Sequence, residues 1–312
     1  MGKIPSRILC IGALHWDRQL RCLHEESSGE SNPVVTTHCP GGVALNVATT
    51  LIQLGCNVGL SSRVGKDKDG DSILDHLATT KIDPVAIESD DTIGTASYTA
   101  VLDIDGNLII GLADMSIYDR LDDRYWSEHT ADLAGWNAWC IDTNLPESGL
   151  RYLCSQKNKP RLYALATSPA KITRLRTMIE ELDTLIVNIA EASALTGTLQ
   201  VGLDGAQEAA RLLFESGIHR TLVTAGPAGA AWADYTGTGV IPGVSQPGHT
   251  KSVSGAGDTL SGVVIAALEQ GQSTEVALQF GVQAGALAVE SGNTSTRQSW
   301  ELIQERLYSI NG

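Results

Sequence analysis

Short apolar runs that end in glycine or in a polar residue recur along the chain. The first is Arg7–Ile11, which Gly12 follows directly. A run of this kind is typical of a strand buried on both faces in a parallel sheet, rather than of a half-exposed strand. After residue 130 similar runs alternate with helical stretches, and they lie at 139–142, 161–165, 185–188 and 220–224. The alternation predicts an α/β chain whose parallel sheet is covered by helices on both faces.

Two stretches carry clear helix signals. Residues 43–54 are rich in small residues and are expected to form a helix, with Gly55 as its C-cap. Residues 206–216 are expected to form a helix with its N-cap near Asp204 and its end at Gly217.

Two segments interrupt this alternation with a β pattern. The first turns polar after residue 17 and ends in a strand-like run before Pro40. The second contains two β-rich runs around an Asp-Gly step, which is the sequence signal of a hairpin. We expect the segments at about 14–40 and 92–118 to form a small sheet attached to a single domain that spans 1–312.

The composition narrows the class of protein. Apolar residues make up 42% and charged residues 19% of the 312 residues, which excludes a disordered chain. A net charge of −14 argues against a nucleic-acid partner, although backbone amides can still bind a small anion. No apolar run approaches the ~18 residues of a membrane span, and no secretory signal pattern is present. With six cysteines in no C-x-x-C spacing, we expect a cytoplasmic protein with free thiols and no membrane partner.

The segment from Gly255 to Thr259 carries the sharpest chemical signal. Gly-Ala-Gly is a poor helix interior but a good helix entry, because backbone N–H groups converge there without side chains in the way. The first turn of the following helix offers unpaired N–H donors and the positive end of the helix dipole to an anion. Asp258 stands beside these donors, where it suits a general base. The alternative is an Asp that only caps the helix.

Three further segments end apolar runs with glycine or polar residues. Gly41 and Gly42 precede a helix that carries Asn46, an arrangement that suits a polyhydroxylated ligand or a simple turn. Asn188 and Glu191 follow a buried strand and suit either Mg²⁺ with its waters or a capping box. The residues from Thr224 to Gly229 end another strand and fit a nucleotide that lies across the strand ends. The phosphate-binding P-loop, the dinucleotide G-x-G-x-x-G loop, the G-x-S-x-G elbow and zinc spacings are absent from the sequence.

Taken together, these motifs resemble the ribokinase-like (PfkB) carbohydrate kinases over essentially the whole chain. The residues that carry the resemblance are, in chain order, Gly12 with Asp17, Gly41 and Gly42 with Asn46, Gly65 with Asp67, Asn188 with Glu191, Gly226 with Gly229, and Gly255-Ala256-Gly257-Asp258. Six loose motifs in one order are far more specific than any one of them.

The resemblance implies a three-layer α/β/α fold with a mainly parallel central sheet and a small β-sheet lid. It also implies ATP- and Mg²⁺-dependent phosphorylation of a sugar-type hydroxyl, with Asp258 as the base and the amides of residues 255–257 as an anion hole. The residues that the resemblance assigns are Gly255, Ala256, Gly257 and Asp258 for catalysis, Asp17, Gly41, Gly42 and Asn46 for the sugar, Asn188 and Glu191 for Mg²⁺ (through water) and phosphate, and Thr224, Gly226 and Gly229 for the nucleotide.

One branch of the family fits best. Residues 113–118 and the Ser-Val-Ser before the Gly-Ala-Gly unit resemble the pseudouridine kinases. That branch phosphorylates the ribose 5′-hydroxyl of pseudouridine to give pseudouridine 5′-phosphate and ADP, and it adds Asp114 and Met115 to the expected substrate contacts. The alternative for these two residues is a strand end with Met115 packed on the core. A kinase for ribose, adenosine or fructose and a silent kinase-like binding protein remain alternative functions.

Two positions depart from the family pattern. Ser252 stands where many members have Asp, which weakens a K⁺ site of the usual kind, although backbone carbonyls still allow one. His15 and Trp16 are bulkier than in many relatives and either reach a nucleobase or fill the lid interface. If the lid strands expose apolar edges, a second copy of the chain is a natural cover, so we expect a homodimer through the lid strands.

Overall fold

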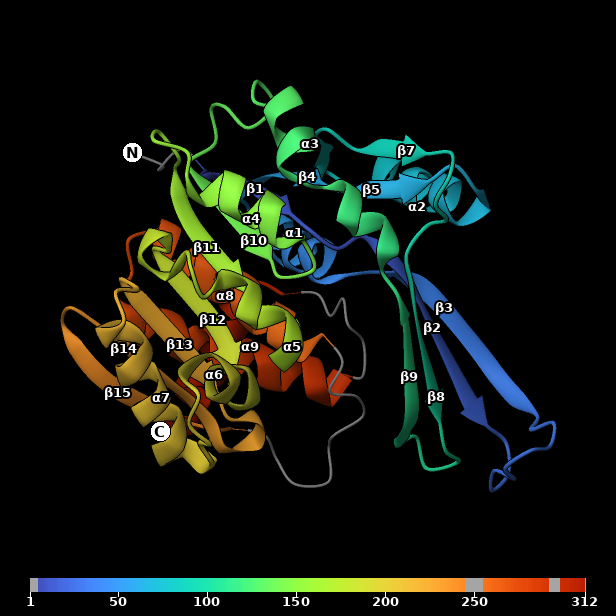
Figure 1. The fold of residues 1–312 in the computed structure, drawn as a ribbon. Helices are drawn as coiled ribbons and strands as arrows, with labels where there is room; N and C mark the ends of the chain where they lie inside the picture. The colour runs from blue at the N-terminus through green and yellow to red at the C-terminus, as the bar shows by residue number, and fades with distance from the viewer. Residues whose placement is uncertain (1–4, 245–254, 292–297, 312) are drawn as a thin grey trace.

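A nine-stranded sheet runs through the computed structural model, which describes residues 5–244, 255–291 and 298–311 (Figure 1). Seven of the strands are joined by parallel pairing only, and two antiparallel strands extend one edge. In spatial order the strands are β15 (Gly237–Pro242), β14 (Gly229–Asp234), β13 (Arg220–Thr224), β12 (Thr184–Asn188), β11 (Arg161–Leu165), β10 (Ala138–Asp142), β1 (Arg7–Ile11), β4 (Asn57–Ser61) and β6 (Asp83–Pro84). The parallel sheet is as predicted. The antiparallel pair β14–β15 was not predicted, because its runs are rich in Ala and Gly rather than in β-branched residues.

Helices cover both faces of this sheet. Successive side chains of a strand point to opposite faces, so they pack in two different hydrophobic cores. Ile8 and Cys10 belong to one hydrophobic cluster, and Leu9 and Ile11 belong to the other. All four side chains are fully buried, and burying each apolar side chain of this size contributes roughly 1.5–3 kcal/mol. The apolar runs of the sequence therefore mark strands that are buried on both sides.

The layers are built from helices of different parts of the chain. The first core packs against α1 (Val43–Gln53), α2 (Lys68–Ala78), α8 (Ala256–Glu269), α9 (Thr274–Ser291) and α10 (Trp300–Asn311). The second core packs against η1 (Ser116–Arg120), α3 (Asp123–Glu128), α4 (Glu147–Cys154), α5 (Pro169–Ile172), η2 (Thr173–Leu175), η3 (Ile179–Glu181), α6 (Ile189–Thr196) and α7 (Gly202–Glu215). Within the described ranges, no helix is both long and apolar enough to span a membrane.

The expected start of α7 was wrong. The helix begins at Gly202 with Val201 as its N-cap, so Asp204 lies inside the first turn. A carboxylate there is favoured by the helix dipole rather than by a capping hydrogen bond. Helix α1 matches its prediction to within a residue, because Gly55 follows its end with φ of 84°.

A separate four-stranded sheet forms the lid and projects from the body of the molecule (Figure 1). Its order is β3 (Val34–Gly41), β2 (His15–Cys22), β8 (Ser97–Leu102) and β9 (Leu108–Asp114). These strands lie inside the two segments expected to form the lid. A short two-stranded pair of β5 (Arg63–Gly65) and β7 (Glu88–Asp90) lies beside it.

Candidate active site

A cavity of about 200 Å³ lies at the carboxyl ends of β11, β12 and β13, beside the start of α8. This is the edge of an open α/β sheet at which ligands usually bind. Five residues that the sequence nominated line it together, namely Asn188, Glu191, Thr224, Gly257 and Asp258. The fold therefore joins the expected phosphate and nucleotide contacts to the expected base in one cavity.

The start of α8 presents backbone amides of the kind that an anion site requires. Gly255 is the N-cap with φ of 75°, and no side chain caps the helix. The first hydrogen bond of the helix runs from the amide of Thr259 to the carbonyl oxygen of Gly255, at 2.9 Å. The amides of Ala256 and Gly257 precede that bond, so they have no acceptor within the helix and lie at the positive end of the helix dipole. Gly257 is exposed and has nothing near its missing Cβ, so an anion can reach the backbone there.

Asp258 stands at the same turn and is held by a side chain from α1. Nδ2 of Asn46 donates a hydrogen bond of 2.7 Å to Oδ2 of Asp258. Burial raises the pKa of Asp258 to about 6, and the nearby carboxylates of Asp142 and Asp17 act in the same direction. The hydrogen bond from Asn46 and the proximity of His15 oppose that rise in pKa. A carboxylate with this pKa can accept a proton near neutral pH.

The lid brings a third carboxylate toward this site. Asp17 lies on β2, opposite Cys39 of β3, and its Oδ1 is 3.2 Å from Nδ1 of the buried His15. A Cβ on Gly41 would overlap Oδ2 of Asp17, and a Cβ on Gly42 would overlap the carbonyl of Ala13. Close packing against other protein groups therefore requires glycine at both positions, independently of any ligand contact.

Asn188 and Glu191 form the capping box that was the alternative for this pair. Oδ1 of Asn188 accepts from the amide of Glu191 at 2.9 Å, and Oε2 of Glu191 accepts from the amide of Asn188 at 2.8 Å. The box does not use Oε1 of Glu191, and this side chain lines the cavity. Burial raises the pKa of Glu191, and Asp258 raises it further. The described residues hold no cluster of three or more metal-ligating side chains. One carboxylate fits a Mg²⁺ ion that keeps most of its waters.

The three expected nucleotide contacts at and after the end of β13 differ in their surroundings. Thr224 is paired with Asn188 across the parallel strands and lines the cavity. Gly226 begins the short turn η4 (Gly226–Ala228), where it is exposed with φ of 57°. Gly229 is buried, and a Cβ there would overlap the carbonyl of Ile241. The packing of β14 on β15 thus accounts for this last glycine.

The structure does not bring Asp114 and Met115 together with Asp17. The strand register puts Asp114 in one row with Ser97 and Trp16, so it lies on the face of the lid sheet opposite to Asp17. Met115 is partly buried and packs on the second core, which was the alternative to a substrate contact for this residue.

The two bulky lid residues have different surroundings. Trp16 donates from Nε1 to the carbonyl of Asp69 in α2 at 2.9 Å, so it fills the base of the lid. His15 lies beside Asp17. Ser252, which bears on the K⁺ prediction, lies outside the described residues.

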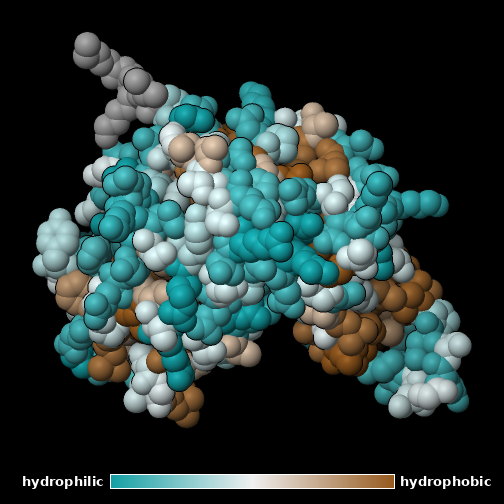
Figure 2. All heavy atoms as spheres, turned by 45° about the horizontal axis from the view of Figure 1, so that its top comes forward, coloured by the Kyte–Doolittle hydropathy of each residue, from teal (hydrophilic) through white to brown (hydrophobic). Residues whose placement is uncertain are grey.

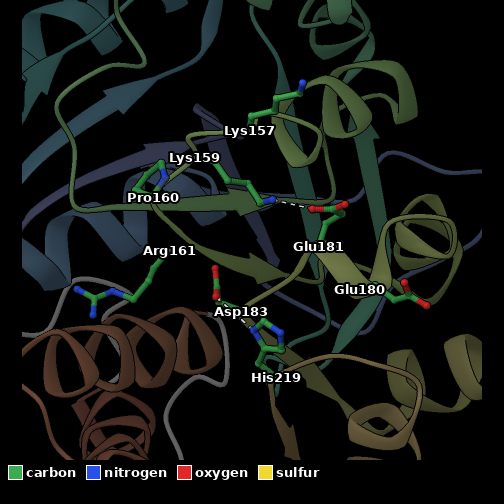
Figure 3. Close-up of a pocket in the computed structure, with 8 residues that line it drawn as sticks. All are labelled: Lys157, Lys159, Pro160, Arg161, Glu180, Glu181, Asp183 and His219. Atoms are coloured by element: carbon green, nitrogen blue, oxygen red, sulfur yellow. Dashed lines mark hydrogen bonds and ion pairs between the residues drawn. The ribbon is translucent and has the colours of Figure 1, made fainter.

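A larger cavity, of about 360 Å³, opens at the opposite end of the sheet beside Arg161, the first residue of β11 (Figure 3). Nζ of Lys159 lies 2.7 Å from Oε2 of Glu181, and Nδ1 of His219 lies 3.4 Å from Oδ1 of Asp183. Four of its charged or titratable side chains thus form two pairs, and none of the nominated site residues lines the cavity. We therefore place the chemistry in the smaller cavity.

Comparison with known proteins identifies the family. The family model described as pfkB family carbohydrate kinase matches residues 5–301. The chain belongs to this family. It is 25% identical to the pseudouridine kinase of Escherichia coli (strain K12) over 270 residues, which cover 85% of each chain. It is 28% identical to a guanosine-inosine kinase of Exiguobacterium acetylicum over 259 residues, which cover 82% of this chain and 85% of that one.

The fold agrees with this assignment. A solved carbohydrate kinase from Agrobacterium tumefaciens superposes with a TM-score of 0.84 and 30% identity, covering 97% of each chain. The three-layer ribokinase-like fold with a lid sheet is therefore confirmed, and the protein is an ATP-dependent carbohydrate or nucleoside kinase.

Sequence reasoning did not nominate Asp142, although it named the strand that ends there. Asp142 is the last residue of β10, is 1% exposed and raises the pKa of Asp258. A carboxylate that ends a run of buried apolar residues was the available signal, and it is the same kind of signal that singled out Asn188.

Proposed function

We propose that Asp258 is the general base and that the amides at the start of α8 stabilise the transferred phosphoryl group. The observation that carries this proposal is the shared turn. Gly257 and Asp258 line one cavity, and the amides of Ala256 and Gly257 precede the first hydrogen bond of the helix. In the reaction, an acceptor hydroxyl gives its proton to Asp258 while its oxygen attacks the γ-phosphorus of ATP. The bond to the β-phosphate oxygen breaks, and ADP leaves with the electron pair. Phosphoryl transfer needs positioning and charge neutralisation more than covalent chemistry, which this arrangement supplies.

The proposed acceptor is the ribose 5′-hydroxyl of pseudouridine. The similarity to a pseudouridine kinase and the Ala-Asp-Met-Ser-Ile-Tyr segment at 113–118 support this choice. Asp17, Gly41, Gly42 and Asn46 are the proposed ribose contacts, because Asp17 and Asn46 both lie near Asp258. The prediction that Asp114 and Met115 contact the substrate rests only on the resemblance to the pseudouridine kinases.

The acceptor is tested by comparing kcat/KM for pseudouridine, guanosine, adenosine, ribose and fructose at fixed MgATP. Pseudouridine should give the highest value, and ³¹P NMR of the product should show a 5′-phosphomonoester. A higher kcat/KM for guanosine, the substrate class named in another relative, would replace pseudouridine while leaving the kinase mechanism in place.

Glu191, with Asn188 beside it, is the proposed contact for Mg²⁺ and for its bound waters. When bound, Mg²⁺ neutralises charge on the phosphates. Thr224 and Gly226 are the proposed nucleotide contacts, since Thr224 ends the neighbouring strand β13 and Gly226 comes two residues later. Gly229 was predicted to join them and is the weakest of the set because it is buried. Activity with and without KCl tests the K⁺ prediction.

We also propose a homodimer through the lid strands. Every residue of β9 is exposed, and large apolar side chains gather on the lid (Figure 2). They are Val35, Leu108, Ile109, Ile110 and Leu112. Apolar patches of this kind on a sheet edge are usually covered by a partner. Sedimentation velocity should give a dimer for the native chain and a monomer for Ile110→Asp, and a native monomer at micromolar concentration would contradict the proposal.

A further inference from the structure

Asp142 is a buried carboxylate to which the proposed reaction assigns no task. It ends β10, next to β1 in the sheet, and its side chain accepts two backbone N–H groups. Oδ2 accepts from Ala13 at 2.7 Å, and Oδ1 accepts from Asn144 at 2.8 Å. Gly12 makes this approach possible, because a Cβ there would overlap the carboxylate. Asp142 therefore holds the corner at which the chain leaves β1.

The next residue of the same corner is held from the other side. The hydroxyl of Tyr118 donates to the carbonyl of Leu14 and accepts from its amide, both at 2.8 Å. Tyr118 is fully buried in η1, which directly follows the lid strand β9. Two consecutive residues, Ala13 and Leu14, are thus fixed by side chains from distant segments. His15 follows at once as the first residue of β2.

We propose that Asp142 is a positioning residue: by clamping the corner between β1 and β2, it sets where the lid carries Asp17 relative to Asp258. Tyr118 is the second half of the same clamp. Asp17 is the third residue of β2, the strand that begins directly after the clamped Leu14, so a displaced corner displaces Asp17 directly. Positioning of this kind matters because small displacements of reacting groups cost large factors in rate. The inference rests on the proposed roles of Asp17 and Asp258.

The same carboxylate has an electrostatic effect on the base. Burial raises the pKa of Asp142, and its hydrogen bonds from Ala13 and Asn144 and the nearby Lys171 of α5 oppose the rise. Lys171 approaches through Asn144, whose Oδ1 accepts from Nζ at 2.6 Å. The groups whose charge or hydrogen bonding bears on Asp258 are Asn46 from α1, His15 and Asp17 from β2, Cys140 and Asp142 from β10, and Glu191 from α6. Removing the Asp142 charge should therefore lower the pKa of Asp258.

Three variants separate the clamp from the charge. Asp142→Asn removes the charge and one acceptor, Tyr118→Phe removes a tether without changing charge, and Asp234→Asn removes another buried carboxylate at the far end of the sheet. The measurement is kcat/KM for the acceptor from about pH 5 to 8, with KM for MgATP determined separately, using whichever acceptor the wild type phosphorylates best.

We expect both clamp variants to raise the acceptor KM roughly threefold to tenfold, the factor of one hydrogen bond, with KM for MgATP nearly unchanged. Asp142→Asn alone should also move the acid limb of the profile down by about 0.5 to 1 pH unit. Asp234→Asn should change neither quantity. An unchanged acceptor KM in Tyr118→Phe would overturn the proposed clamp. The same changes in Asp234→Asn as in Asp142→Asn would also overturn it. The Tyr118→Phe result tests the clamp even if Asp142→Asn does not fold. Full activity of Asp258→Asn would instead refute the proposed base, so the two failures are distinguishable.

Discussion

Asn46 and Asp258 lie 212 positions apart in the sequence, and Nδ2 of Asn46 donates a hydrogen bond of 2.7 Å to Oδ2 of Asp258. Helices α1 and α8 come close enough for this because residue 262 is glycine: a Cβ there would approach the side chain of Thr50 to 2.7 Å. The Asn46 amide thus orients the carboxylate without using the free backbone amides of α8. The pair physically links the proposed sugar contacts to the proposed phosphate site.

Replacing Asp258 by Asn should abolish catalysis and stabilise the protein. Asn keeps the acceptor for Asn46 but cannot take up the proton, so kcat should fall by several orders of magnitude while KM for MgATP changes little. The pKa of Asp258 is raised to about 6 in the folded protein, above its value in the unfolded chain. Its contribution to stability is therefore fully present at pH values below the unfolded pKa, and it is lost as the pH rises through about 6. At pH 8 the ionised Asp258 therefore costs stability, about 1–3 kcal/mol, and the variant should melt a few degrees higher. Single-turnover kinetics and calorimetry measure the two effects.

The control for the stability effect is Asp234→Asn, where the sign is reversed. Burial raises the pKa of Asp234, but its hydrogen bonds with Thr236 and Thr274 and the charge of Arg220 lower it overall. A carboxyl with a depressed pKa stabilises the fold above its unfolded pKa, so this variant should melt lower at pH 8. If both variants lowered the melting temperature, the raised pKa of Asp258 would be refuted.

The acid limb of the pH profile should report Asp258 and respond to Asn46. Because the base acts when ionised, kcat/KM should rise with pH with a midpoint near 6. The hydrogen bond from Asn46 lowers the pKa of Asp258, so Asn46→Ala should move the midpoint to higher pH. A profile that is flat between about pH 5 and 7, or a midpoint that moves down in the variant, argues against this pairing.

Gly41→Ala should weaken acceptor binding selectively. The added methyl group would overlap Oδ2 of Asp17 and push that carboxylate away from its place beside His15. We expect the acceptor KM to rise at least roughly tenfold, with KM for MgATP changed less than twofold. Gly205→Ala is the matched control, because Gly205 lies in α7 and its new methyl group meets only Gln200. An equal rise of KM in both variants would show a general loss of structure.

Glu191→Gln should raise the Mg²⁺ concentration needed for half-maximal rate. The amide oxygen of Gln can still accept from the Asn188 backbone, and the backbone amide of residue 191 can still donate to Oδ1 of Asn188. The capping box therefore keeps both of its hydrogen bonds while the charge is lost. Loss of a carboxylate near the ion should weaken Mg²⁺ activation by a factor of roughly ten or more. Titration of the initial rate with MgCl₂ at fixed ATP measures this factor, with Glu208→Gln on the exposed face of α7 as the control. An unchanged titration would remove Glu191 from the metal's surroundings.

The pattern of the sequence determined the parallel part of the sheet, its coverage by helices and the two lid segments. The run at 8–11 can be recognised because both faces of the strand are buried there, so its consecutive residues are all apolar. The glycines that begin α8 and precede α1 are equally readable, because backbone with positive φ favours glycine at Gly255 and Gly42.

Only the tertiary structure decided which polar side chains meet. The sequence could not show that Asn46 would bond Asp258, that the strand register would turn Asp114 to the other face of the lid, or that Asp142 would reach back to Ala13. Local patterns depend on the burial and backbone conformation of each segment alone. Contacts between segments depend on strand order, register and the distance at which helices pack, and these are fixed only when the whole chain has folded.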